Sequence, residues 1–348
     1  MTKQATCLDV ARACGVSTAT VSMALRGMAR VAPRTRKLVE AQAARLGYSP
    51  DNAASLLGRR RAKGRVKRER MVVAVLDAAP RPREPQAPEI AGFDCRFFRL
   101  TETAPVQKLL DQLWHQGVAG IVLRAFHGKL WPVAEMAAAD WSRFCVVKLS
   151  RALPELPFHL VRHSAADYMR LTLEKTVAAG YRRIAVIQHT SASEIDDDAR
   201  YGVVKAYQER RCPPGVRIDM REVPEEEMRK VSRGTASWLR SQRPDAVIVP
   251  VASMFFALRD MVPRLPARVG VAALFTNGRP VGDGPTVSGC DTAYGELHAR
   301  ALELLRDLIL RGERGFVARV SEHVVEPQWI EGETLPPVPH PRRRGPRT

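Results

Sequence analysis

The first seventy residues carry the side chains with the most evident chemistry, which is the binding of phosphate. They hold 16 Lys and Arg against 4 Asp and Glu, a net charge of +12 out of +18 for the whole chain. Guanidinium and ammonium groups bind phosphate oxygens, so a basic segment of this density indicates a polyanion partner. Residues 71–335 hold 35 basic and 33 acidic side chains, and residues 336–348 add four arginines and no acid. The sequence therefore predicts a polyanion-binding module joined to a nearly neutral body.

Side chains suited to catalysis or metal binding are present, but their spacing favours neither. The eight histidines have no catalytic spacing, and the sequence has no GxSxG, P-loop or HExxH motif and no GxGxxG after its first strand-like run. Six scattered cysteines form no CxxC pair, which argues against a zinc site or a disulfide framework. The acidic run Glu194, Asp196, Asp197 and Asp198 could hold a divalent cation, but adjacent carboxylates on a loop are usually solvated. We therefore expect neither an enzyme nor a resident metal.

Composition and hydropathy indicate a globular protein in a reducing compartment. With 45% hydrophobic and 26% charged residues, the 348-residue chain has material for two or three domains. No apolar run approaches the roughly 18 residues of a membrane helix. The first residues, MTKQATCLDVARACG, lack the apolar core of a secretion signal. We expect a cytoplasmic protein with no membrane contact and no cofactor.

Residues 6–25 show the pattern of two short helices joined by a tight turn. Thr6 with Asp9 three places later is typical of a capped helix start, and Gly15 suits the left-handed residue that follows a helix. Ser17 is a good N-cap for the second helix. The predicted buried side of that helix consists of Val21, Ala24 and Leu25. Two helices that cross closely around so short a turn form a helix-turn-helix.

A third helix is predicted from Arg34 to Leu46, with Pro33 in its first turn and Gly47 at its end. Its predicted apolar side consists of Leu38, Val39 and Leu46. Five arginines surround the second helix: Arg12, Arg26, Arg30, Arg34 and Arg36. Such a ring supplies phosphate contacts, while the helix it frames reads bases. We therefore predict an all-α helix-turn-helix DNA-binding domain at residues 1–49 and a basic linker at residues 50–70.

Three stretches of this region occur in a characteristic order: TCLDVARACGVSTATVSMALRG, RVAPRTRKLVEAQAARLGYSP and a short segment that ends in SLLG. In this order they resemble the LacI family of bacterial transcription regulators, densely over residues 5–58. The resemblance implies that DNA is contacted by Thr6, Ser17, Thr18, Ala19, Ser22, Met23, Arg26, Thr35, Asn52, Ala54 and Leu57. Thr18, Ala19 and Met23 would face base edges, and Leu57 of a hinge helix would enter the minor groove at the operator centre.

Beyond residue 70, short apolar runs alternate with amphipathic segments. The strand-like runs are 71–76, 119–123, 145–149, 183–188, 245–250 and 269–274. The helix-like segments are 105–116, 164–179, 200–211, 226–242, 254–262 and 293–311. This alternation favours doubly wound α/β sheets, and its length suits two lobes. The four prolines of residues 79–91 disfavour a helix there.

GYRRIAVIQH, PDAVIVP and TAYGELHARALELLRDLILRG resemble segments of the same family's body. The resemblance implies a two-lobed, periplasmic-binding-protein-like effector and dimerisation domain at residues 71–335, with crossovers near residues 162, 290 and 325. Residues 336–348 would be a basic, disordered tail. A homodimer implies two reading helices related by a two-fold axis, and so a pseudo-palindromic operator in double-stranded DNA.

Members of this family bind a small effector between the lobes, and the sequence departs from their pattern. VASM and LFTNG stand where polar family residues are expected, and the residues left for an effector site are Asp77, Arg124, Arg200 and Asn277. This set favours an anionic ligand. We predict a DNA-binding transcription regulator, and more specifically a repressor, that is controlled by a small molecule. A ligand-independent regulator with a degenerate sensor lobe stays open beside it, and a stand-alone binding protein and an enzyme are the further alternatives.

Overall fold

The computed structural model of the chain describes residues 5–25, 30–46, 48, 71–78, 92–125, 131–228, 230–261, 269–280 and 284–338. Contacts divide the chain into two compact units. The first consists of Met1–Val161 and Leu297–His323, the second of Arg162–Glu296 and Val324–Thr348. The chain passes between the units after Val161, Glu296 and His323, where we predicted passages near 162, 290 and 325. Below, lobe 1 is the α/β part of the first unit and lobe 2 is the second unit.

The N-terminal module contains α1 (Cys7–Cys14), α2 (Thr18–Leu25) and α3 (Pro33–Leu46). Its capping follows the predicted chemistry: the Asp9 carboxylate accepts from the Thr6 backbone N–H at 2.8 Å, and the Thr6 hydroxyl accepts from the Asp9 N–H at 3.4 Å. Gly15 has φ 65°, the left-handed conformation that ends α1. The core consists of Val10, Ala11, Val21, Ala24, Leu25, Val31, Val39 and Ala43. One prediction is wrong, because Leu38 is 45% exposed while its neighbour Val39 is fully buried.

Lobe 1 is built on a six-stranded sheet in the order β11-β5-β4-β3-β1-β2. Its strands are β1 (Met71–Asp77), β2 (Phe93–Arg99), β3 (Gly120–Leu123), β4 (Cys145–Lys148), β5 (His159–His163) and β11 (Glu322–Val325). Its helices are α5 (Val106–His115), α6 (Val133–Ala138) and most of α12 (Tyr294–Arg311). Helix α12 lies so close to the sheet that a Cβ on Gly120 would be 2.8 Å from Leu305. The segment between β1 and β2, where the prolines disfavour a helix, lies outside the described residues.

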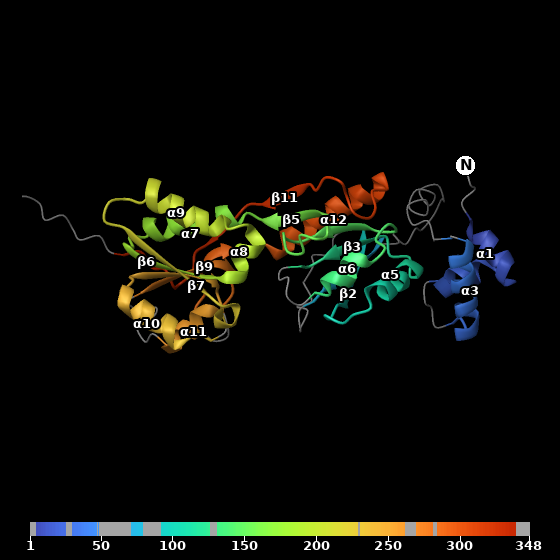
Figure 1. Cartoon of the computed structure of the whole chain (residues 1–348), viewed down its shortest axis with the longest axis horizontal. Helices are drawn as coiled ribbons and strands as arrows, with labels where there is room; N and C mark the ends of the chain where they lie inside the picture. Colours follow the sequence, from blue (N-terminus) through green and yellow to red (C-terminus); the bar gives the residue numbers. More distant parts are fainter. Residues whose placement is uncertain are drawn as a thin grey trace, which may run out of the picture. The chain divides into compact units, whose positions relative to one another are not determined.

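Lobe 2 repeats this design with a sheet in the order β12-β10-β9-β8-β6-β7. Its strands are β6 (Arg183–His189), β7 (Arg217–Val223), β8 (Ala246–Val251), β9 (Gly270–Thr276), β10 (Ser288–Asp291) and β12 (Trp329–Ile330). Its helices are α7 (Ala165–Ala178), α8 (Thr190–Asp196), α9 (Ala199–Arg210), α10 (Arg233–Gln242) and α11 (Met254–Met261), with a 3₁₀ turn at Glu225–Met228. Within this lobe, Figure 1 shows α7 and α9 on one face of the sheet and α10 and α11 on the other.

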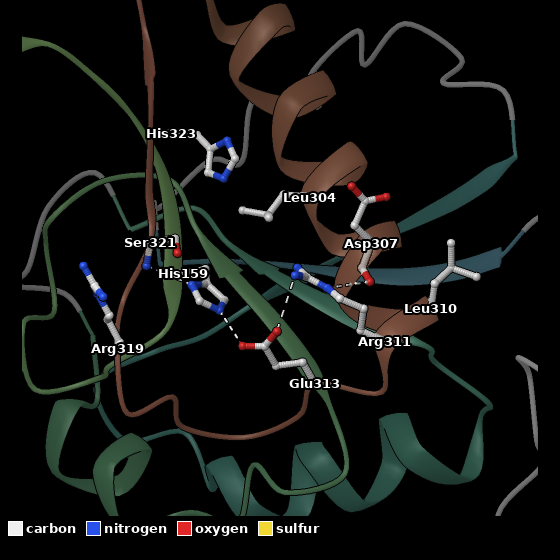
Figure 2. Close-up of a pocket in the computed structure, with 9 residues that line it drawn as sticks. All are labelled: His159, Leu304, Asp307, Leu310, Arg311, Glu313, Arg319, Ser321 and His323. Atoms are coloured by element: carbon white, nitrogen blue, oxygen red, sulfur yellow. Dashed lines mark hydrogen bonds and ion pairs between the residues drawn. The ribbon is translucent and has the colours of Figure 1, made fainter.

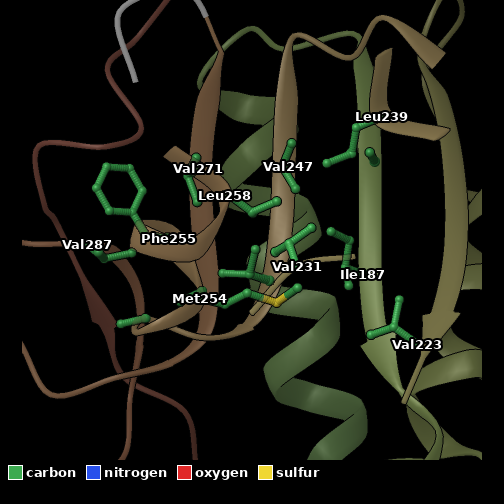
Figure 3. Close-up of a cluster of buried hydrophobic side chains, with 14 residues drawn as sticks. Ile187, Val223, Val231, Leu239, Val247, Met254, Phe255, Leu258, Val271 and Val287 are labelled. Carbon is green, nitrogen blue, oxygen red and sulfur yellow. The ribbon is translucent and has the colours of Figure 1, made fainter. Parts of the chain in front are cut away.

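Alternation along the buried strands of lobe 2 produces two apolar layers, one on each face. Ala185, Ile187, Val247, Val249, Val271 and Ala273 belong to the layer under α10 and α11 (Figure 3). Their direct neighbours Ile184, Val186, Ala246, Ile248, Ala272 and Leu274 belong to the layer under α7 and α9. Because successive side chains of a strand point to opposite faces, a continuous apolar run can fill both layers. The predicted helix-turn-helix module and two α/β lobes are thus confirmed.

The structure departs from the expected elements at several places. The six predicted strands occur within two residues of their expected ends, but β2, β5, β7, β10, β11 and β12 were not predicted. Edge strands such as β2 and β7 face solvent on one side and lack a continuous apolar run. Helix α10 begins at Arg233, after the N-cap Ser232, and not at residue 226. Among the described residues, no helix has both the length and the apolar character that a bilayer crossing requires.

The predicted tail starts later than expected. The Pro336 carbonyl accepts from the Tyr181 hydroxyl at 2.7 Å, and the Val338 N–H donates to the Ala179 carbonyl at 2.8 Å. Gly180 has φ 98°, and a Cβ there would lie 3.1 Å from Val338. Residues 336–338 are therefore fixed to lobe 2, and the rest of the predicted tail lies outside the described residues.

Candidate DNA-reading helix and ligand-binding residues

Helix α2 presents an uncharged face that is suited to reading bases. Thr18 and Ala19 are exposed and Ser22 and Met23 are half-buried, whereas Val21, Ala24 and Leu25 form the buried stripe of α2. The Ser17 hydroxyl caps the helix, because it accepts from the Thr20 N–H at 3.0 Å. No acidic residue lies in the first turn, so the positive end of the helix dipole is not neutralised from within the helix.

Met23 has a second role that the resemblance does not imply. It is half-buried and packs against the core of the module, beside Val16 and Leu46. Only part of the thioether side chain is therefore free to touch a base. Thr18 and Ala19 are the exposed residues of this face, and their small side chains would let the helix approach a groove closely.

The same module carries basic and hydroxyl side chains that solvent reaches. Arg12, Arg30 and Arg34 are exposed, as is Thr6, and Arg36 and Thr35 are half-buried. Exposed guanidinium groups are suited to phosphates flanking a groove. Four of the residues that the resemblance assigns to DNA contact lie outside the described residues: Arg26, Asn52, Ala54 and Leu57.

In lobe 1, two predicted effector residues meet at the carboxyl ends of neighbouring strands. Asp77 ends β1 and Arg124 follows β3, and Nη1 of Arg124 lies 3.2 Å from Oδ2 of Asp77. The two side chains are 8% and 9% exposed. Ligands of open α/β sheets bind at this edge. The buried pair of Asp77 and Arg124 would offer a ligand both hydrogen-bond donors and acceptors, and its two charges nearly cancel.

A buried lysine lies at the same edge and was not among the predicted site residues. Lys148 ends β4, and its Nζ donates to the Leu153 carbonyl at 2.8 Å. Burial lowers the pKa of Lys148 to about 8, although the charges of Glu155 and Glu322 act in the other direction. Leu153 has φ 61°, a left-handed conformation that is strained for a branched side chain. The lysine thus holds a strained turn. A sequence pattern does not reveal this role, because CVVKL reads as an ordinary strand.

In lobe 2, Arg200 is buried against a carboxylate. Its Nε lies 2.6 Å from Oδ2 of Asp196, and the side chains are 10% and 9% exposed. Its guanidinium also lies 5.7 Å from the ring centre of Phe275. Asp196 was expected to be solvated with its acidic neighbours, and that expectation is wrong. Burial raises the pKa of Asp196 and lowers that of Arg200.

Asn277, the fourth predicted effector residue, forms a local turn. It is exposed, and its Oδ1 accepts from the Arg279 N–H at 3.2 Å. This side-chain turn stabilises the loop after β9. Asn277 follows β9 at the sheet edge to which Phe275 belongs, but the structure does not bring it into contact with Arg200.

An aromatic group borders Arg200 and was missed by sequence reasoning. The His163 ring lies 5.0 Å from the ring of Tyr168, 5.1 Å from that of Phe275 and 6.5 Å from that of Tyr294. His163 Nε2 lies 2.6 Å from the Thr292 carbonyl, so this nitrogen carries the proton. Burial lowers the pKa of His163 to about 4, and the charge of Arg200 acts in the same direction. At neutral pH this group is an uncharged aromatic surface beside a buried ion pair.

Lobe 1 also contains a pocket of about 640 Å³ that no predicted site residue lines. Figure 2 shows Glu313 between His159 and Arg311: its carboxylate lies 2.8 Å from His159 Nε2 and 3.8 Å from Arg311 Nη2. The other ring nitrogen, Nδ1, accepts from the Ser321 N–H at 2.9 Å, so His159 is neutral and donates from Nε2. Arg319 and His323 are exposed at the same pocket. Among the described residues, no group of three or more His, Cys, Asp or Glu is arranged to hold a metal.

Comparisons with known proteins agree with this geometry. The family model of the LacI-family bacterial regulatory proteins matches residues 6–51. Comparison with curated proteins gives no match. Among solved structures, a lac repressor dimer bound to operator and the anti-inducer ONPF is similar over 96% of this chain and 100% of its own, with 17% identity and a TM-score of 0.54.

Two further structures support the same fold. A LacI-family transcriptional regulator from Silicibacter pomeroyi is 22% identical over 95% of this chain and 99% of its own, with a TM-score of 0.52. A LacI-family regulator from Enterococcus faecium with bound ribose is 13% identical over 77% of this chain and 100% of its own, with a TM-score of 0.54. The N-terminal module is thus a helix-turn-helix domain of the LacI family, and the two lobes have the fold of the LacI-family regulators.

Proposed function

We propose that the chain is a sequence-specific, DNA-binding transcription regulator that acts as a homodimer and represses genes next to its operator. The observation that carries this proposal is the exposed, uncharged face of α2 on a module that also exposes Arg12, Arg30 and Arg34 and matches the LacI-family model. A DNA-binding regulator works where the chromosome is, so we place it in the cytoplasm. We assign it no enzymatic activity.

Selection of duplexes from a random library tests this proposal. A homodimer with two-fold symmetry is expected to enrich a pseudo-palindrome, with half-sites about one helical turn or a multiple apart. Thr18→Gln is expected to change the preferred base at one position of each half-site. The control substitution is Gln42→Glu, which lies on α3 and not on the reading helix. Thr20 of α2 is unsuited to this purpose, because its N–H donates to the Ser17 hydroxyl that caps the helix. Recovery of no common sequence would contradict the proposal.

We further propose that a small, polar and uncharged molecule binds at the carboxyl edge of the lobe 2 sheet, beside Arg200. Anionic ligands were expected from the cationic residues alone, but Arg124 and Arg200 are each paired with a carboxylate. Hydroxyl groups can accept from such arginines and donate to their carboxylates at once, and aromatic faces suit the apolar side of a ring compound. The aromatic group of His163, Tyr168, Phe275 and Tyr294 supports this class of ligand.

Thermal unfolding with panels of compounds tests the ligand class. A ligand present at 100 times its Kd adds about 2.7 kcal/mol to the free energy of unfolding. We expect the shift with neutral polyhydroxylated compounds, and its loss in Phe275→Ala. A shift only with phosphorylated or carboxylated compounds would instead support the anionic ligand. If neither panel shifts the unfolding transition, the result favours the alternative, a regulator that works without a ligand and retains a degenerate sensor lobe.

A further inference from the structure

The amino-terminal edge of the lobe 2 sheet carries a dense group of arginines that the proposed function does not use. Seven exposed arginines belong to it: Arg182, Arg183, Arg210, Arg211, Arg217, Arg240 and Arg243. We call these seven residues the arginine edge. Four carboxylates accompany them, from Glu174, Glu209, Asp219 and Asp245.

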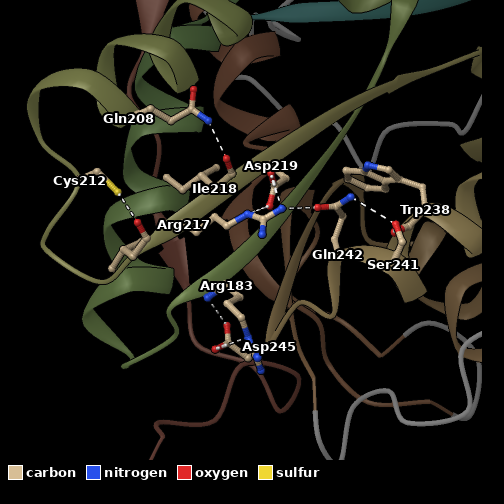
Figure 4. A network of polar contacts seen from close by, with 11 residues as sticks. Arg183, Gln208, Cys212, Arg217, Ile218, Asp219, Trp238, Ser241, Gln242 and Asp245 are labelled. Carbon is tan, nitrogen blue, oxygen red and sulfur yellow. Dashed lines mark hydrogen bonds and ion pairs between the residues drawn. The ribbon is translucent and has the colours of Figure 1, made fainter.

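The sheet register and a few contacts bring the arginine edge together. Arg183 and Arg217 are the first residues of β6 and β7, and they are register partners in the parallel ladder. The Gln242 side chain at the end of α10 accepts from Arg217 Nη2 at 2.5 Å, and the Gln208 side chain near the end of α9 donates to the Ile218 carbonyl at 2.6 Å. Figure 4 shows these contacts around the start of β7. The last turns of α9 and α10, with their arginines, therefore flank the starts of the strands.

Three of the four carboxylates at this edge have partners within it: Asp245 binds backbone N–H groups, Asp219 pairs with Arg217, and Glu174 lies 3.8 Å from Arg211 Nη1. Oδ1 of Asp245 accepts from the Arg183 N–H at 2.7 Å and from the Arg182 N–H at 3.1 Å. Asp219 pairs with Arg217 at 2.7 Å. Among the described residues, the guanidinium groups of Arg182, Arg210, Arg240 and Arg243 form no ion pair or hydrogen bond. Four guanidinium groups thus face solvent with all their donors available.

The chain that leaves this edge is also basic. Pro336 and Val338 are hydrogen-bonded to Tyr181 and Ala179. These two partners lie in the segment that directly precedes Arg182 in the sequence. Arg342, Arg343, Arg344 and Arg347 follow in the sequence, without an acid. The sequence that follows the edge therefore carries further positive charge.

We propose that the arginine edge binds the phosphate backbone of duplex DNA without regard to sequence, as a second DNA contact besides α2. Guanidinium forks match phosphate oxygens, and a group of exposed arginines suits a densely charged polyanion. A protein partner would also require apolar anchors, since aromatic and aliphatic side chains dominate protein interfaces. Among the seven arginines the described surface exposes no large apolar side chain except Val338. The inference does not depend on the proposed function, because it concerns DNA of any sequence.

The first experiment locates the contact on the unaltered protein. The full-length chain is treated with phenylglyoxal, which modifies accessible arginines, with and without a non-specific duplex, and the modified residues are identified by mass spectrometry. DNA is expected to protect Arg182, Arg210, Arg240 and Arg243 at least threefold, and to leave the exposed Arg99 and Arg279 unprotected. No protection of these four residues overturns the proposal. Equal protection by poly-glutamate at the same charge concentration also overturns it and indicates an acidic protein as the partner.

The second experiment measures the phosphate contacts. A variant with Arg182, Arg210, Arg240 and Arg243 all changed to Gln is compared with a control in which Arg99, Arg233, Arg279 and Arg319 are changed to Gln. Each neutralised phosphate contributes about 0.9 to the slope of log K against log salt, so the first variant is expected to lose up to about 3.6 from the slope for each subunit that contacts DNA. The control is expected to keep the slope of the wild type. Equal slopes for the wild type, the variant and the control overturn the inference. A further variant, Arg34→Gln with Arg36→Gln, tests the α2 module separately.

Discussion

Asp196 and Arg200 lie on two successive helices of lobe 2, and their side chains form a buried ion pair with 2.6 Å between Oδ2 and Nε. The reversal between α8 and α9 makes this contact possible. Asp197 and Asp198 both have φ 56°, in the left-handed region that Asp tolerates better than most residues. The acidic run is therefore divided between a buried partner for Arg200 and two exposed turn residues.

Breaking this pair is expected to destabilise the protein strongly. Asp196→Asn leaves the buried Arg200 guanidinium without its counter-charge, and such a loss costs about 3–5 kcal/mol. The double variant Asp196→Leu, Arg200→Met removes both charges and is expected to lose clearly less. Urea unfolding of the three proteins measures the difference. A loss below about 1 kcal/mol in Asp196→Asn would show that Arg200 is stabilised by other groups.

The second prediction concerns acid stability and His163. The folded pKa of His163 is about 4 against an ordinary 6.5, so the unfolded chain binds a proton at higher pH than the folded chain does. The stabilising effect of the neutral ring is complete above pH 6.5 and is lost as the pH falls to 4. At about 1.36 kcal/mol for each pH unit, the loss amounts to at most about 3 kcal/mol.

His163→Gln is the matched variant, because its amide can still donate to the Thr292 carbonyl. The free energy of unfolding is measured at several pH values between 4 and 7. The wild type is expected to lose more stability than the variant over this range. Parallel pH profiles would mean that His163 titrates in the folded protein as it does in the unfolded chain.

The sequence predicted the parts of the fold whose physical cause is local. Thr6, Gly15 and Ser17 form the expected caps, because capping depends on a few neighbouring residues. The buried strands were found because a parallel sheet covered on both faces needs a continuous apolar run. The edge strand β2, FDCRFFR, alternates charged and apolar residues without a continuous apolar run and was not predicted.

The candidate ligand residues were predicted less well, since their contacts come from distant parts of the chain. Asp77 and Arg124 meet because β1 and β3 are neighbours in the sheet, although 47 positions separate them in sequence. His163 and Phe275 contact each other across more than a hundred residues. The burial of Leu38 could not be predicted for a different reason, which is local. Helical periodicity places Leu38 and Val39 on adjoining faces of α3, and only the packing of the folded module decides which of the two is buried.

The third prediction concerns alkaline pH and Lys148. Between pH 8 and 10.5 the unfolded chain keeps the proton of Lys148 while the folded chain releases it. The stability of the wild type is therefore expected to rise with pH across this range, by up to about 3 kcal/mol. Lys148→Met removes the titrating group. The stability difference between the two proteins, measured by urea unfolding at pH 7, 8, 9 and 10, is expected to move in favour of the wild type as the pH increases. A constant difference would contradict the folded pKa.

The last prediction divides the specific DNA affinity between the ends of the chain. If the N-terminal module anchors the operator complex, Arg34→Gln with Arg36→Gln removes up to two phosphate contacts per subunit, or four per homodimer. The slope of log K against log salt for the selected operator then decreases by about 3.6, and the affinity decreases with it.

Deletion of residues 339–348, which removes four arginines, is the matched change at the other end. It is expected to change the preference for operator over random duplex much less, because a sequence-independent contact strengthens binding to both duplexes alike. Binding is measured by fluorescence anisotropy on both duplexes from 50 to 300 mM salt. A larger loss of operator preference from the deletion than from the two substitutions would place the specific contact outside the α2 module.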